Sequence, residues 1–125
     1  MTLTFTAPSI YQGMKSNTER LFADHLEVLR RAGQIVQWRY ECTKFKVGGK
    51  AEHGKQAWYT PDFDAITCEG EKVFYEVKGS WDAKNQRDAK TRIKVCAEKY
   101  AEYTWYAVQK AKGRGGGWDF ERFGA

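Results

Sequence analysis

The stretch "YTPDFDAITCEGEKVFYEVKG", residues 59–79, decides the fold. Apolar and polar residues alternate in both halves, and a Glu-Gly turn separates them, so the pattern predicts a hairpin whose first strand is 57–67. Side chains two apart on a strand face the same way, which places Glu76 and Lys78 on one face. The hairpin brings Asp62 beside them. Three charged side chains are therefore expected to meet at one end of this hairpin.

The segment before the hairpin predicts a helix followed by a strand. Residues 16–33 have helical apolar spacing, a capping box formed by Ser16 and Glu19, and a terminal Gly33. Residues 35–41, "IVQWRYE", alternate between apolar and polar side chains, as a strand does. Residues 46–56 are polar and rich in glycine, which indicates a loop or a hairpin tip.

The segment after the hairpin predicts a second helix and a last strand. Residues 82–102 carry an apolar stripe at helical spacing, and residues 104–110, "TWYAVQK", are typical of a strand. The stripe consists of Ala89, Ile93, Cys96 and Tyr100.

The predicted class is α/β, with α+β character: a mixed four-stranded sheet flanked by two helices, in the order αβββαβ. The unit spanning 71–110 should be a right-handed parallel crossover. A chain of 125 residues is long enough for one domain, 1–125. Residues 1–15 are expected to be an irregular lead-in, and 111–125 a flexible, glycine-rich link and tail.

The charge and the cysteine content indicate which kind of partner and which cellular compartment to expect. The net charge is +5, and basic residues outnumber acidic ones from Lys78 to Arg114, which suggests a polyanionic partner such as DNA. Three widely spaced cysteines match no zinc motif and no disulfide framework, which favours a reducing compartment. No apolar run approaches membrane-spanning length, so no membrane partner and a cytosolic location are expected.

The converging carboxylates of Asp62 and Glu76 repel each other, and a cation would relieve that repulsion. Mg²⁺ suits such a pair, because it accepts a few carboxylate oxygens and keeps waters and substrate phosphates as its other ligands. Lys78 would then orient the attacking water or neutralise charge on phosphorus. Hydrolysis of a phosphodiester bond needs a positioned nucleophile and positive charge on the pentavalent transition state, and these groups would supply both.

These residues resemble a known family. "PDF" at 61–63 and "EVKG" at 76–79, with the order of elements around them, are similar to the PD-(D/E)XK nuclease superfamily. More narrowly, residues 11–110 resemble a phage and prophage family within this superfamily. The segments that carry this resemblance are "SNTERLFADHLEVLRRAGQI", "YTPDF", "EVKG" and "RIKVCAEKY".

The resemblance implies a restriction-endonuclease-like core and a role for each matching residue. Asp62, Glu76 and the backbone carbonyl of Val77 would bind the metal, and Lys78 would be the catalytic lysine. Glu19 matches an additional helix-borne acid that reaches the same metal. Lys94 matches a basic residue of the second helix that points toward the active site.

Further residues are candidates for DNA contact. The basic strip of the second helix would touch phosphates; it comprises Lys84, Arg87, Lys90 and Lys94. Trp81, which follows Gly79 and Ser80, could be exposed and stack on a base. Core packing is the default for Trp58 and Tyr59.

Each assignment has an ordinary structural alternative. Asp62, Glu76 and Lys78 could form a solvated salt-bridge cluster on a hairpin. Glu19 is explained equally well by helix capping, and Lys90 by solvation.

The leading hypothesis is a deoxyribonuclease of a phage or prophage that uses Mg²⁺, with Mn²⁺ as a substitute, on double-stranded or branched DNA in the host cytosol. A homodimer would serve double-strand cutting, because one subunit offers one site. The alternatives are a non-catalytic nucleic-acid-binding module and a small adaptor in a phage replication or packaging complex.

Overall fold

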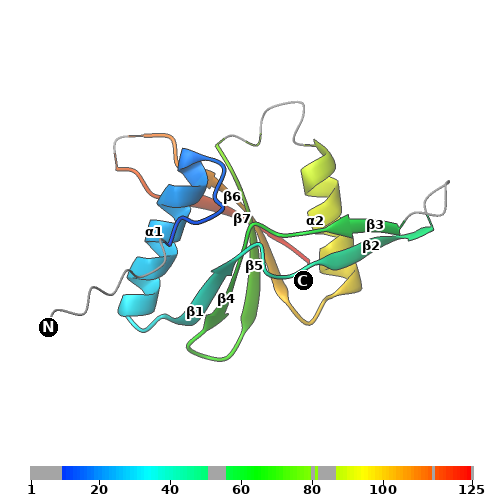
Figure 1. The fold of residues 1–125 in the computed structure, drawn as a ribbon, viewed down its shortest axis with the longest axis horizontal. Helices are drawn as coiled ribbons and strands as arrows, with labels where there is room; N and C mark the ends of the chain where they lie inside the picture. Colours follow the sequence, from blue (N-terminus) through cyan, green and yellow to red (C-terminus); the bar gives the residue numbers. More distant parts are fainter. Residues whose placement is uncertain (1–9, 51–55, 80, 82–86, 114, 125) are drawn as a thin grey trace, which may run out of the picture.

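A computed structural model describes residues 10–50, 56–79, 81, 87–113 and 115–124, without the side chains of 49, 50, 56, 57 and 87. Figure 1 shows two helices lying on either side of a twisted sheet, with a small hairpin beside the second helix. The elements are α1 (Asn17–Arg31), β1 (Ile35–Tyr40), β2 (Phe45–Lys50), β3 (Gln56–Tyr59), β4 (Phe63–Thr67), β5 (Lys72–Lys78), α2 (Arg87–Lys99), β6 (Thr104–Lys110) and β7 (Trp118–Phe123).

The main sheet has five strands in the order β1-β4-β5-β6-β7. The β5–β6 pair is parallel and the other pairs are antiparallel, so the expected mixed sheet and the parallel connection through α2 are confirmed. The sheet, however, has one strand more than the predicted four. Within the described residues, neither helix has the length and apolarity that crossing a membrane requires.

Two buried clusters pack on opposite faces of the sheet. Val73, Tyr75 and Val77 join the cluster that contains the buried face of α1, whereas Phe74 joins the cluster that contains the stripe of α2. This division follows from the alternation of side chains along β5. The predicted stripe of α2 is confirmed, since Ala89, Ile93 and Cys96 are buried and Tyr100 packs against them.

Both ends of α1 form as the sequence predicts. The Ser16 hydroxyl accepts the N–H of Glu19 at 3.1 Å and so caps the first turn. At the other end, Gly33 adopts a positive φ of 78°, and the N–H of Gln34 donates to the carbonyl of Leu29 at 2.9 Å. This is a Schellman ending, which favours glycine at that position.

The predicted strand 57–67 is two strands in the structure. β3 ends at Tyr59 and β4 begins at Phe63, and Pro61, which has no N–H to donate, lies in the gap. β3 pairs instead with β2 in a separate two-stranded sheet, so the segment predicted as a loop or hairpin tip belongs to a formed hairpin.

The prediction of a flexible tail is wrong. Residues 118–123 pair with β6 as the outer strand β7, and Phe123 is buried in the α2-side cluster. The glycines before it form a turn: Gly117 has a φ of 94°, and its carbonyl accepts the N–H of Ala111 at 3.0 Å. A run of glycines indicates backbone freedom, but here that freedom serves a reversal of the chain.

We expect Phe123→Ala to lower the free energy of unfolding by about 3–5 kcal/mol, because it empties a buried aromatic site. Phe120→Ala is the matched control on the same strand, since its side chain is 45% exposed; it should cost on the order of 1 kcal/mol. Urea titration of both variants measures the difference. Equal, small losses would mean that β7 contributes nothing to the fold.

Candidate functional site

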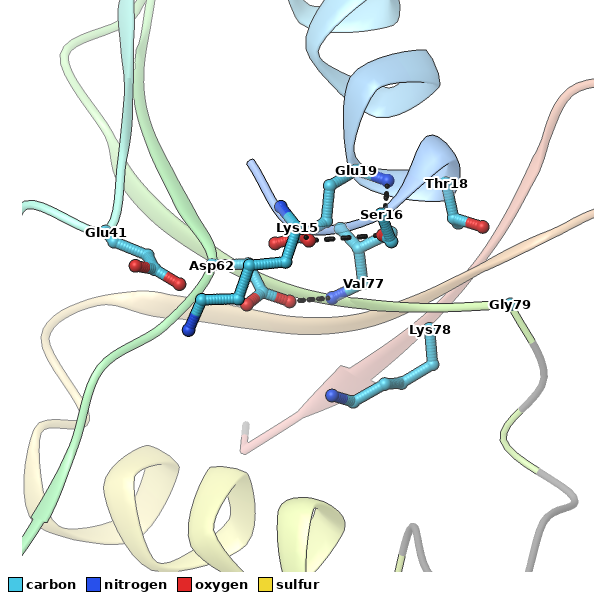
Figure 2. Close-up of a pocket in the computed structure, with 9 residues that line it drawn as sticks. All are labelled: Lys15, Ser16, Thr18, Glu19, Glu41, Asp62, Val77, Lys78 and Gly79. Carbon is cyan, nitrogen blue, oxygen red and sulfur yellow. Dashed lines mark hydrogen bonds between the residues drawn. The ribbon is translucent and has the colours of Figure 1, made fainter. Parts of the chain in front are cut away.

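An open pocket of about 410 Å³ lies where the start of α1 meets the end of β5. Figure 2 shows acidic side chains and two lysines directed toward it from different elements. It is lined by Lys15, Ser16, Thr18, Glu19, Glu41, Asp62, Val77, Lys78 and Gly79. The structure thus brings together Asp62, Lys78 and Glu19, as the sequence predicts.

Asp62 lies at the centre of the site, just before β4. Its carboxylate accepts the N–H of Val77 at 2.8 Å, a contact that fixes it against β5 (Figure 2). Burial, and then the negative charge of Glu76, raise the pKa of Asp62 to about 8; the Val77 N–H and Lys78 oppose this rise. A second carboxylate close by therefore makes a charged Asp62 costly unless a cation is present.

Glu19 approaches the pocket from the first turn of α1 and is buried. One carboxylate oxygen accepts the Ser16 hydroxyl at 3.1 Å and the Lys15 N–H at 3.2 Å, and the other accepts the Tyr40 hydroxyl at 2.7 Å. Glu19 therefore makes the capping contacts and also lies in the acidic cluster. The two interpretations of Glu19 are compatible with one another in this geometry.

Glu41 is a pocket residue that the sequence did not indicate. Each of Glu19, Glu41 and Asp62 offers a carboxylate oxygen, and these atoms lie within 4.8 Å of one another. Glu41 has a positive φ of 47°, which is uncommon for a residue other than glycine, and its N–H donates to the Asp62 carbonyl at 2.8 Å. The only hint in the sequence is its position at the end of a predicted strand.

Glu76 is near Asp62 but is held by other partners. Its carboxylate accepts the Tyr59 hydroxyl at 2.7 Å and lies 3.6 Å from the Lys78 ammonium. Burial raises its pKa, and the contacts with Tyr59 and Lys78 offset part of that rise. Among the described residues, Glu76 belongs neither to the pocket lining nor to the acidic cluster. Asp62 and Glu76 therefore influence each other through their charges, but they do not point at one shared metal position as predicted.

Lys78 is placed as the sequence predicts, on the same face of β5 as Glu76. Its side chain is 30% exposed and lines the pocket (Figure 2). Lys15 adds a second positive charge from the segment before α1. The pocket therefore carries both carboxylate ligands and cations, the two kinds of group that a phosphate and its metal require.

The expectation that Trp81 is exposed for stacking is wrong. Trp81 is only 9% exposed, because its indole packs on the α2-side cluster and donates to the Val108 carbonyl at 3.0 Å. The prediction for Trp58 is also wrong, because this residue, expected in the core, is 50% exposed. Tyr59 is buried as predicted.

The predicted basic strip is only partly described. Lys90 lies 3.1 Å from Glu121 and over the Trp81 ring, so it is paired within the protein rather than simply solvated. Lys94 is exposed on α2 and does not line the pocket. Lys84 and the side chain of Arg87 lie outside the described residues.

No protein-family model, curated protein or solved structure matches this chain. The site must therefore be judged on its own chemistry.

The raised pKa of Asp62 predicts a pH-dependent stability. An acid with a higher pKa in the folded than in the unfolded state weakens folding as the pH rises from near 4 to about 8. Asp62→Asn removes this cost and keeps an acceptor for the Val77 N–H. Without divalent ions, its Tm should exceed that of the parent by at least about 4 °C at pH 8.5 and differ little near pH 4.5. Thermal unfolding followed by circular dichroism gives the comparison.

Asp119→Asn, which changes an exposed carboxylate on β7, serves as the control and should show no such trend. A gap in Tm that is constant between pH 4.5 and 8.5 would contradict the electrostatic origin.

Proposed function

We propose that this protein is a metal-dependent deoxyribonuclease with a restriction-endonuclease-like core, which hydrolyses phosphodiester bonds during phage or prophage DNA processing in the host cytosol. One observation carries the proposal: three acidic side chains and Lys78 line one open pocket at the end of β5. A solvated salt-bridge cluster would spread along the hairpin instead. Its acids would be exposed, whereas Glu19 is buried and Asp62 is half-buried.

The arrangement of elements supports the same proposal. Without the β2–β3 hairpin and β7, the order is α1, β1, β4, β5, α2 and β6, with the strands neighbouring one another in that sequence. Setting those parts aside in this way leaves an order compatible with the αβββαβ core that we propose. The hairpin is then an insertion before β4, and β7 an addition at the far edge.

The three carboxylates are suited to Mg²⁺ or Mn²⁺. Two oxygens bound to one Mg²⁺ at about 2.1 Å lie at most about 4.2 Å apart. Adjacent oxygens of an octahedral ion lie closer, about 3 Å apart. The oxygens of Glu19, Glu41 and Asp62 lie within 4.8 Å of one another, so side-chain shifts on the order of 1 Å would bring them onto one ion. When bound, the ion would polarise the phosphate and lower the pKa of a coordinated water.

The protein's own residues would position the other groups. The Val77 N–H holds Asp62 in the pocket, and Tyr40 and Ser16 hold Glu19. Lys78 places an ammonium where negative charge grows on the phosphorus oxygens as water attacks and the bond to the leaving oxygen breaks. Glu76, which lies beside Lys78, orients that ammonium; the carbonyl of Val77 remains a proposed ligand.

The DNA would approach over the open side of the pocket, toward Lys15 and Lys78. Lys94, Arg87 and Lys84 remain proposed phosphate contacts, whereas Lys90 would first have to leave Glu121. A homodimer would supply the second cut of a duplex.

Lys78→Ala should reduce single-turnover cleavage by about a hundredfold, because the loss of one preorganised electrostatic partner has effects on that scale. DNA affinity measured in Ca²⁺ should change little, since binding is spread over many phosphate contacts. Lys78→Arg should not restore the rate, because the planar guanidinium cannot replace a compact ammonium. Lys110→Ala, an exposed lysine at the end of β6, is the control and should keep the parent rate.

Equal losses of binding and cleavage in Lys78→Ala would reduce Lys78 to a phosphate anchor. The second candidate, a non-catalytic nucleic-acid-binding module, is favoured by the contacts that hold Glu76 outside the acidic cluster. It would replace the nuclease if the parent bound DNA but cleaved neither DNA nor RNA with Mg²⁺ or Mn²⁺.

A further inference from the structure

The β2–β3 hairpin has two chemically different faces. In the register of the pair, Phe45 lies opposite Tyr59 and Lys46 opposite Trp58. Phe45 and Tyr59 are buried in the α2-side cluster, so their face is the inner one. Because side chains alternate along each strand, Lys46 and Trp58 occupy the outer face.

The outer face presents one large aromatic ring, with one lysine ammonium over it and a second lysine next to it. Trp58 is 50% exposed, and the Lys44 ammonium lies 5.8 Å from the centre of its ring. Lys46 stands beside it as its cross-strand partner. A single exposed apolar residue needs no explanation, but a tryptophan with two lysines beside it, both from the β2 side, is complementary to a stacked, negatively charged ligand.

This outer face is held rigidly by its surroundings. The carbonyl of Lys46 accepts hydrogen bonds from the Tyr100 hydroxyl at 3.1 Å and from the Lys99 ammonium at 3.3 Å, both on or next to α2. The ring of Phe45 meets those of Phe74 and Trp105 at centroid distances of 4.9 and 5.0 Å. Such support pre-organises the platform and lowers the entropy cost of binding on it.

The platform is also close to the candidate active site. Trp58 precedes Asp62 by four residues, and four residues of extended chain span at most about 14 Å. That distance corresponds to about four nucleotide steps of 3.4 Å along a strand. Tyr59, next to Trp58, donates to Glu76 at 2.7 Å and so connects the inner face of the hairpin to the site itself.

We infer that the outer face of the β2–β3 hairpin binds an unpaired nucleotide of the DNA substrate: the base stacks on Trp58, and the flanking phosphates meet Lys44 and Lys46. The inference rests on the proposed function for its choice of DNA as the ligand. It specifies the substrate further, because a stacked base must be free of its pair. Forked or single-strand-tailed DNA should therefore be preferred over a blunt duplex.

The chemistry of the face favours DNA over a second copy of this protein. The chain carries a net charge of +5, and the ring is bordered by lysines, so pairing two such faces would bring like charges together. The base of an unpaired nucleotide supplies a ring to stack on Trp58, and its phosphates supply the opposite charge.

The test measures binding with Ca²⁺ in place of Mg²⁺, by fluorescence anisotropy, on a blunt duplex and on the same duplex with a single-stranded fork. Trp58→Ala should weaken fork binding by about 5- to 150-fold, the loss expected for one stacked base, and change blunt-duplex binding less than about twofold. Trp58→Phe should retain most of the affinity. Phe120→Ala, which removes a similarly exposed aromatic ring from β7, is the matched control and should not discriminate between the two DNAs.

Three results would overturn the inference: fork affinity unchanged in Trp58→Ala, equal losses on both DNAs, or a parent dimer in sedimentation that Trp58→Ala dissociates. The outcome is separate from that of the nuclease proposal. Metal-dependent cleavage without any Trp58 effect removes the platform and leaves the nuclease. A Trp58-dependent fork preference without cleavage leaves the platform on a binding module.

Discussion

The crowding of carboxylates beside β5 is the constraint on which the rest of the structure depends. Asp62, Glu19 and Glu41 present oxygens within 4.8 Å of one another, and burial together with the negative charge of Glu76 raises the pKa of Asp62. Acids held this close in a partly buried site are unfavourable without compensation. The protein compensates with donors that come from several different elements.

These donors connect the architecture to the site. The hydroxyl of Tyr40 ties β1 to Glu19 on α1, the N–H of Val77 ties β5 to Asp62, and the hydroxyl of Tyr59 ties the hairpin to Glu76. Each bond satisfies a carboxylate and also fixes the position of one element relative to another. A site assembled in this way is pre-organised, because each of Glu19, Asp62 and Glu76 is held by a contact between elements.

The β2–β3 hairpin and β7 also contribute to the fold by packing. The β2–β3 hairpin covers the α2-side cluster with Phe45 and Tyr59, and β7 closes the same cluster with Phe123. In this arrangement Trp81 is buried, whereas Trp58 is exposed on the hairpin. The proposed nucleic-acid contacts therefore lie on the hairpin as well as on α2.

Local sequence determined the two helices, the strands β1, β5 and β6, and one half of the site. The capping box and Gly33 set the ends of α1, and the alternation in 72–78 placed Glu76 and Lys78 on one face, because these are short-range rules of backbone geometry. The alternation of apolar and polar residues in β1 could not show that its pairing with β4 is irregular between Ile35 and Gln37. This irregularity leaves Val36 exposed. It also could not show that a glycine-rich tail returns as β7.

Only the tertiary structure decided which acids meet. Glu41 reaches the pocket because β1 pairs with β4 and its N–H bonds to the Asp62 carbonyl, a relation between residues far apart in the chain. Glu76 turns to Tyr59 because the hairpin folds back over the α2 side of the sheet. Burial of Trp81 and exposure of Trp58 likewise depend on what packs against each ring, and packing partners follow from the whole fold rather than from neighbours in sequence.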